Sequence, residues 1–212
     1  MKSSTIKTVK ILLAISRFLT LLCNPILIPT IGFVALFTIS YLIVFPIQYK
    51  LSVLGLIFTL TYLMPVLLIV LYLKLNSWTY RSLIIHRERR LIPYILVVIC
   101  YLCCLYVMYR INMPRCMIGI VVSALLSMII CMIINYFWKV SVHMAGMGQL
   151  IGGIIAFSLI FYYNPIVWLS LFILLAGAQG SSSIIVRHHS LAQVLTGQFL
   201  GLICGLSGIL FL

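Results

Sequence analysis

Long apolar runs, each close to the length that crosses a bilayer, make up most of the chain. A transmembrane helix needs about 20 mostly apolar residues, and only helices or closed barrels satisfy the backbone inside lipid. The runs therefore predict an all-α protein, a polytopic transmembrane helical bundle of about seven spans in a single integral membrane domain, residues 1–212. The expected spans are residues 25–46, 51–73, 93–109, 116–137, 144–163, 165–186 and 190–212.

A more polar N-terminal segment, residues 6–23, precedes these runs. It contains basic residues and an apolar stretch, but no clear small-residue cleavage site of a signal peptide follows it. We expect either an amphipathic helix at the membrane interface or a short first span. Arg17, in the middle of the segment, favours the interfacial helix.

Charge in this chain is scarce and almost entirely positive. Fourteen Lys and Arg residues stand against one acid, Glu88, and with 65% hydrophobic residues no soluble basic domain remains to hold nucleic acid. Mg²⁺-dependent phosphoryl transfer, carboxylate dyads and acid-based proton relays all need more carboxylates than one. We therefore expect no metal site and no cofactor, and chemistry that uses His, Ser, Cys, Tyr, Lys or Arg.

Three polar clusters separate the apolar runs, at residues 74–91, 139–143 and 187–189. Two predicted spans lie between each cluster and the next, so all three clusters are expected on one face of the membrane. The basic residues expected on the opposite face are Lys50, Arg110 and Arg115. Both the positive-inside rule and a phosphate-binding site explain this asymmetry, so the side of the membrane on which the clusters lie stays open.

Cysteine and glycine patterns inside the runs indicate packing rather than chemistry. Cys100 and Cys103 form a Cys-x-x-Cys in the middle of a span, which we interpret as small buried apolar side chains. Glycines recur at small-x-x-x-small spacing in the fifth and last runs, a pattern typical of closely packed membrane helices. These glycines are Gly148, Gly152, Gly197, Gly201 and Gly205.

Two of the polar clusters carry His residues in a recognisable pattern. Residues 140–143, Val-Ser-Val-His, resemble the Pro-Ser-Gly-His motif of the type 2 phosphatidic acid phosphatase superfamily, which includes lipid phosphatases and vanadium haloperoxidases. Residues 182–197, SSIIVRHHSLAQVLTG, resemble its third motif, with His189 on the motif His and Gly197 on the motif Gly. The two spans between His143 and His189 also match the family arrangement.

The resemblance extends over most of the chain. It is specific around His143 and His189 and weak at residues 87–93. Residues 24–30, Asn-Pro-Ile-Leu-Ile-Pro-Thr, and 137–143, Phe-Trp-Lys-Val-Ser-Val-His, resemble a divergent branch of small bacterial membrane proteins of this superfamily. Residues 87–93 are a looser counterpart of the first motif, Lys, six residues, Arg-Pro, because no Lys lies at the matching spacing. The resemblance implies a bacterial cytoplasmic (inner) membrane location.

The resemblance also implies a role for each matched residue. His189 would attack phosphorus and form a phosphohistidine, and His143 would protonate the leaving oxygen. Ser141 would donate a hydrogen bond to a phosphate oxygen. The cations that would hold the phosphate are Arg89, Arg90 and Lys139.

Three positions depart from the family motifs. Ser183 replaces the third-motif Arg, Val142 replaces the Gly before His143, and Gln193 replaces the Asp that orients the nucleophilic imidazole. Gln193 would orient the His189 ring without a charge. Arg187, one helical turn after Ser183, is our candidate for the missing phosphate-binding Arg.

The expected function is metal-independent hydrolysis of a lipid phosphomonoester or pyrophosphate, with an anionic phospholipid or a polyprenyl phosphate as substrate. The main alternative is a catalytically degenerate relative that binds a lipid phosphate or a partner. A small transporter with helices broken at Pro29, Pro46 and Pro65 is a weaker alternative, as is a rhomboid-like protease using Ser181–Ser183 and His residues. The lipid and the oligomeric state stay open.

Overall fold

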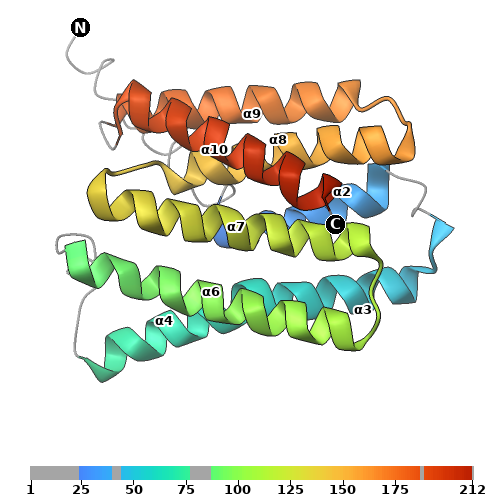
Figure 1. Cartoon of the computed structure of the whole chain (residues 1–212), viewed down its shortest axis with the longest axis horizontal. Coiled ribbons are helices and arrows are strands. Elements are labelled where there is room, and N and C mark those ends of the chain that lie inside the picture. The colour runs from blue at the N-terminus through green and yellow to red at the C-terminus, as the bar shows by residue number, and fades with distance from the viewer. Residues whose placement is uncertain (1–23, 40–43, 77–86, 187–188, 212) are drawn as a thin grey trace, which may run out of the picture.

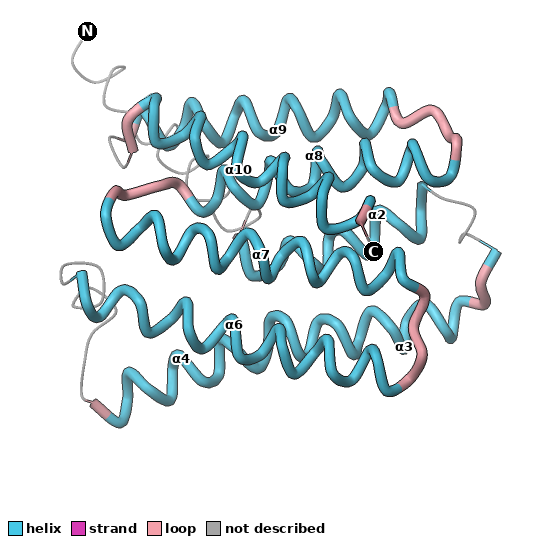
Figure 2. The backbone as a smooth tube through the Cα atoms, in the orientation of Figure 1, coloured by secondary structure: helices cyan, strands magenta, loops and turns pink. Residues whose placement is uncertain are grey.

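The structure is a computed structural model that describes residues 24–39, 44–76, 87–186 and 189–211. The expected interfacial segment, residues 6–23, lies outside these ranges, as do His86, Arg187 and His188. Within the described ranges the chain forms helices and no strands (Figures 1 and 2). The elements are η1 (Pro25–Leu27), α2 (Ile28–Ile39), α3 (Ile47–Phe58), η3 (Thr59–Leu63), α4 (Met64–Leu75), α6 (Arg87–Arg110), α7 (Arg115–Phe137), α8 (Val142–Phe161), α9 (Ile166–Ile185) and α10 (Leu191–Leu210).

Six helices of the described chain are long and apolar enough to cross a membrane. Helices α3, η3 and α4 form one of them, the continuous 29-residue helix Ile47–Leu75, in which the π-helical turn η3 precedes Pro65. The other five are Leu91–Arg110, Arg115–Phe137, Val142–Phe161, Ile166–Ile185 and Leu191–Leu210. This arrangement confirms the polytopic all-α bundle, and it is that of an integral membrane protein.

The first predicted span, residues 25–46, is the exception. Within the described residues its apolar helix covers Pro25–Thr38, about 21 Å at 1.5 Å per residue, against a hydrocarbon core of about 30 Å. Residues 40–43 of this predicted span lie outside the described ranges. Pro46 is the N-cap of α3, where a residue without a backbone N–H is tolerated. The described chain therefore contains six long helices and one shorter one, where the sequence predicted about seven spans.

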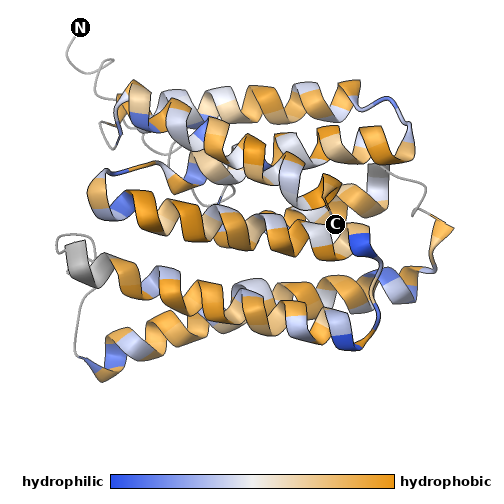
Figure 3. Ribbon diagram, in the orientation of Figure 1, coloured by the Kyte–Doolittle hydropathy of each residue, from blue (hydrophilic) through white to orange (hydrophobic). Residues whose placement is uncertain are grey.

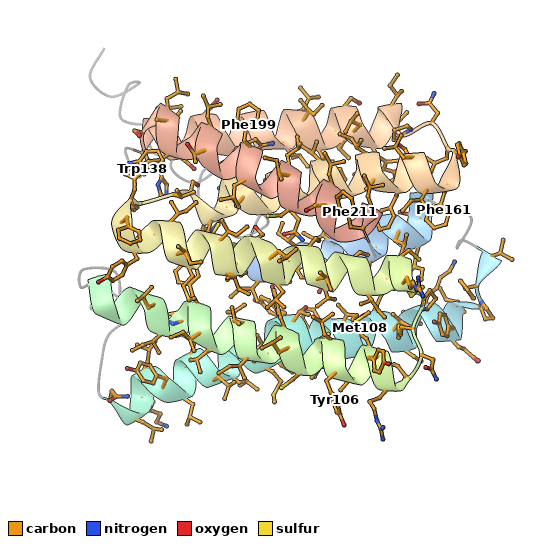
Figure 4. The ribbon with its side chains drawn as sticks, viewed as in Figure 1. Tyr106, Met108, Trp138, Phe161, Phe199 and Phe211 are labelled. Atoms are coloured by element: carbon orange, nitrogen blue, oxygen red, sulfur yellow. The ribbon has the colours of Figure 1, made fainter. Side chains whose placement is uncertain are left out.

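The surface of the bundle is apolar along the middle of the long helices and polar at their ends (Figure 3). Tyr106 and Phe199, which are 65% and 63% exposed, point away from the bundle, whereas Met108 is fully buried (Figure 4). An apolar surface this large is expected where lipid rather than water surrounds the protein.

Both described polar loops of the predicted face lie at one end of the bundle. The connection from α7 to α8 and the start of α10 lie at the end where α6 begins (Figure 1). The turns from α6 to α7 and from α8 to α9 lie at the opposite end (Figure 2). For the parts described, this agrees with the common face that counting spans predicts.

Helices α8 and α10 pack with almost no side chain between them. A Cβ on Gly201 would overlap the carbonyl oxygen of Ala145, and one on Gly197 would lie 2.5 Å from the carbonyl oxygen of Ser141. Backbones can approach this closely only where both helices lack bulky side chains. The close packing predicted from the two glycine patterns is therefore confirmed, and it fixes the start of α8 against the start of α10.

Candidate functional site

A cavity of about 360 Å³ opens at the polar-loop end of the bundle. His143 and His189, both half-buried, line it together with the exposed Lys139. Its volume is within the range of small-molecule sites. The remaining lining residues are Asn24, Pro25, Ile26, Ile69, Pro93, Tyr94, Val97, Met128, Asn135, Val140 and Val142.

The wall that carries Lys139 and His143 is formed where α7 ends and α8 begins. Helix α7 ends at Phe137 because Trp138 adopts an extended backbone, with φ −143° and ψ 131°. After this short connection Ser141 is the N-cap of α8, and His143 is the second residue of that helix. Its position in the first turn holds the imidazole at the cavity rather than deeper in the bundle.

The wall that carries His189 is formed at the start of α10. Ser190 caps this helix: its Oγ accepts a hydrogen bond from the Gln193 N–H at 3.4 Å, and Gln193 Oε1 accepts one from the Ser190 N–H at 3.0 Å. This reciprocal capping box fixes the backbone immediately after His189. The His189 N–H in turn donates to the carbonyl oxygen of Ser183 at 3.4 Å.

The capping box gives Gln193 a structural task that the sequence comparison did not assign to it. Its side-chain carbonyl is occupied by the Ser190 N–H, so that oxygen serves the helix start. The role predicted for Gln193, orienting the His189 ring, stays a prediction. Ser183, at the position of the motif Arg, donates its hydroxyl to the carbonyl oxygen of Gln179 at 2.9 Å.

Ser141 joins the two walls through its backbone. Its N–H donates to the carbonyl oxygen of Gln193 at 3.3 Å, and its side chain is only 1% exposed. Within the described part of the chain, Ser141 Oγ has no hydrogen-bond partner. A buried hydroxyl is normally satisfied. Ser141 is not among the residues that line the cavity, so its predicted contact with phosphate stays a prediction.

Positively charged groups lie beside this cavity. Lys139 is at its rim, and both α8 and α10 begin beside it, so the positive ends of two helix dipoles face it. Glu88, the one acid of the sequence, belongs to the first turn of α6, where no side chain is described. No group of three or more His, Cys, Asp or Glu among the described residues is placed to hold a metal ion. The arrangement favours an anion.

Asn135, Tyr94 and Asn24 are cavity residues that the sequence did not predict. Asn135 is 8% exposed and makes two side-chain hydrogen bonds, one to Val140 and one to Tyr94. A single Asn near the end of an apolar run is the only sequence signal that pointed to it. Asn24 is the first residue of the segment 24–30 that resembles the phosphatase branch. Its Oδ1 accepts a hydrogen bond from the Ile26 N–H at 3.1 Å.

The other predicted phosphate ligands fall where no side chain is described. Arg89 and Arg90 belong to the first turn of α6, whose backbone begins at the cavity end of the bundle. Arg187 lies outside the described residues altogether. Their predicted contacts with phosphate therefore stay predictions. Cys100 and Cys103 lie in the middle of α6 as free thiols and do not line the cavity.

No protein-family model matches the chain, and neither a curated protein nor a solved structure shows significant similarity to it. The phosphatase resemblance therefore stays a prediction from the sequence motifs.

Proposed function

We propose that this protein is a membrane lipid phosphatase-like enzyme that hydrolyses a phosphomonoester or pyrophosphate without a metal ion. The observation that carries the proposal is that His143, His189 and Lys139 line one cavity. These residues come from two segments that are separated by two long helices, α8 and α9. Two imidazoles and a cation beside a helix start are the groups that a metal-free phosphoryl transfer needs.

The chemistry proceeds in two steps. An imidazole nitrogen of His189 forms a bond to phosphorus while the bond from phosphorus to the lipid oxygen breaks, and His143 gives that oxygen its proton. A water molecule then attacks the phosphorus of the phosphohistidine, His143 takes the proton of that water, and the bond from phosphorus to the His189 nitrogen breaks to release inorganic phosphate. Lys139 and Ser141 stabilise the charge on the phosphate oxygens, with Arg89, Arg90 and Arg187 as further candidates.

The cavity wall also suits a lipid substrate. Besides the His residues it is lined by the apolar side chains of Ile69, Val97 and Met128, which belong to α4, α6 and α7. A polar head group beside His143 and an apolar chain against these side chains would match the two halves of the cavity. An anionic phospholipid or a polyprenyl pyrophosphate has this division of polarity.

A second candidate function is binding without turnover. It is favoured by the hydrogen bonds of Ser183 and Gln193, the residues at the positions of the motif Arg and Asp, because both side chains have structural partners. A protein of this kind would keep the anion-binding cavity. It would lack the phosphate-binding Arg and the orienting Asp of the family motif, which accelerate the reaction.

The decisive experiment measures phosphate release by purified protein in detergent with EDTA present, from phosphatidic acid and from undecaprenyl pyrophosphate. We expect release by the wild type and loss of at least 10³-fold in His189→Ala, since removing a nucleophile leaves only residual catalysis. His188→Ala, the neighbouring His without an assigned role, is the matched control and should keep its activity. A folded wild type that releases no more phosphate than His189→Ala would support binding without turnover for these lipids.

A further inference from the structure

Asn135 is a buried polar residue of the cavity wall that makes two side-chain hydrogen bonds. It lies near the end of α7 among apolar residues, and its side chain is 8% exposed. A primary amide buried in this way is costly unless both of its ends are hydrogen-bonded. Both are: Asn135 Oδ1 accepts a hydrogen bond from the Val140 N–H at 2.9 Å, and Asn135 Nδ2 donates one to the Tyr94 hydroxyl at 3.2 Å.

The first of these bonds shapes the connection between α7 and α8. Val140 is 1% exposed and directly follows Lys139, which lines the cavity. The N–H of Val140 belongs to neither helix, so the side chain of Asn135 takes the place of a backbone acceptor. The bond therefore fixes the path of the chain from Trp138 to Ser141, on which the positions of Lys139 and His143 depend.

The second bond joins this connection to α6. Tyr94 lines the cavity and follows Pro93 in the segment that resembles the first phosphatase motif. It lies four residues after Arg90 and so on the same helix face. One side chain thus connects the helix expected to supply phosphate-binding Arg residues with the loop that carries Lys139.

We propose that Asn135 is a positioning residue that sets the distance between the α6 and the α7–α8 walls of the phosphate site. The inference rests on the proposed function, in which Lys139 and His143 contact one phosphate group. Without Asn135 the loop would lose its acceptor and its link to α6 together. Misplacement of catalytic groups by about 1 Å can cost on the order of 100-fold in rate.

The test compares Asn135→Leu and Tyr94→Phe with a matched control, Asn164→Leu. Asn164 also accepts a hydrogen bond from a backbone N–H, that of Ile166 at 3.1 Å, but at the opposite end of the bundle. Phosphate release from phosphatidic acid gives kcat and KM per folded molecule, and calorimetry gives the affinity for inorganic phosphate without any turnover. Melting temperature in detergent reports stability separately.

For Asn135→Leu we expect a loss of about 100-fold in kcat/KM, shared between kcat and KM, and about tenfold weaker phosphate binding. Tyr94→Phe keeps the bond to Val140 and should lose about tenfold in kcat/KM. Asn164→Leu should leave kcat, KM and phosphate affinity unchanged. A purely structural Asn135 would instead lower the melting temperature and leave these constants at wild-type values, which would overturn the inference.

The same measurements separate the inference from the proposed function. A wild type that binds phosphate but releases none overturns catalysis, and weaker binding by Asn135→Leu then still supports the positioning role. A wild type with turnover that Asn135→Leu leaves unchanged overturns the positioning role alone. A folded wild type that neither releases nor binds phosphate overturns both.

Discussion

The pair α8 and α10 and the unit formed by α3, η3, α4 and α6 are held in the bundle in different ways. In α8, 72% of the spanning segment is buried, against 22% in the helix Ile47–Leu75. Glycines bring the backbones of α8 and α10 into direct contact, as at Gly201 and Ala145. Helix α6 instead packs through large buried side chains such as Tyr101 and Met108.

The two walls of the cavity therefore belong to parts of the molecule that pack in different ways. His143 and His189 are attached to the starts of α8 and α10, where backbone contact leaves little freedom. Tyr94, Val97 and Ile69 belong to the side held by side-chain packing. In the proposed reaction the two His residues would lie on the wall with direct backbone contact between helices, and the lipid chain would lie against the wall held by side-chain packing.

The largest effect is expected from Gly201→Leu. The new side chain would collide with the backbone of Ala145, which no rotamer change relieves, so α8 and α10 must separate. We expect a loss of stability above about 4 kcal/mol and little folded protein. The measurement is the monodisperse fraction in size-exclusion chromatography.

Gly177→Leu on α9 is the matched control for this glycine, because nothing lies within 4 Å of a Cβ at that position. It should leave the monodisperse fraction near that of the wild type. Equal behaviour of the two variants would contradict the backbone contact between α8 and α10.

A smaller loss is expected from Met108→Ala on the other side of the molecule. Met108 is fully buried among the side chains of α6 and its neighbours, so truncation leaves a cavity and costs about 2–5 kcal/mol. Thermal unfolding in detergent measures this cost. Tyr106→Ala, whose side chain is 65% exposed, should cost much less; an equal cost would show that α6 does not pack as described.

Lys139→Ala tests the electrostatic part of the cavity. Lys139 is exposed and lines the cavity. The proposed function therefore predicts that KM for the phosphorylated lipid rises by roughly tenfold, which corresponds to the loss of a weak hydrogen bond to a charged group. Arg110→Ala, a cation at the opposite end of the bundle, should leave KM unchanged. Similar changes in both variants would indicate a general charge effect on lipid binding instead of a local one.

Tyr101→Phe should have the smallest effect and the opposite sign. Tyr101 is fully buried, and its hydroxyl has no hydrogen-bond partner within the described chain. Removing an unsatisfied buried hydroxyl should be neutral or stabilising by up to about 1 kcal/mol. A clear drop in melting temperature would mean that this hydroxyl has a partner.

The sequence predicted the packing and the placement of the His residues better than it predicted individual contacts. Glycine spacing predicted the contact of α8 with α10 because spacing alone determines which residues share a helix face. The common face of the Lys139 and His189 segments followed from counting spans. The length of the first predicted span stays a prediction, because residues 40–43 lie outside the described ranges.

Two side chains show what the sequence left undetermined. Ser190-x-x-Gln193 is itself a capping-box pattern, so the hydrogen bonds of Gln193 follow from a local pattern in the sequence. Asn135 was not predictable, because its partners, Val140 and Tyr94, are brought to it by a loop and by a second helix. Contacts of that kind depend on tertiary packing.

In the proposed function His143 and His189 act as one unit in one cavity, and the combined variant tests this most directly. Phosphate release in EDTA would be measured for His143→Ala, His189→Ala and the double variant, each with its folded fraction determined. Residues that act in one reaction are strongly non-additive, so we predict that the double variant is no slower than His189→Ala alone. Two results would contradict this: a rate of release lowered by the product of the two single effects, or a rate in the double variant close to that of the wild type.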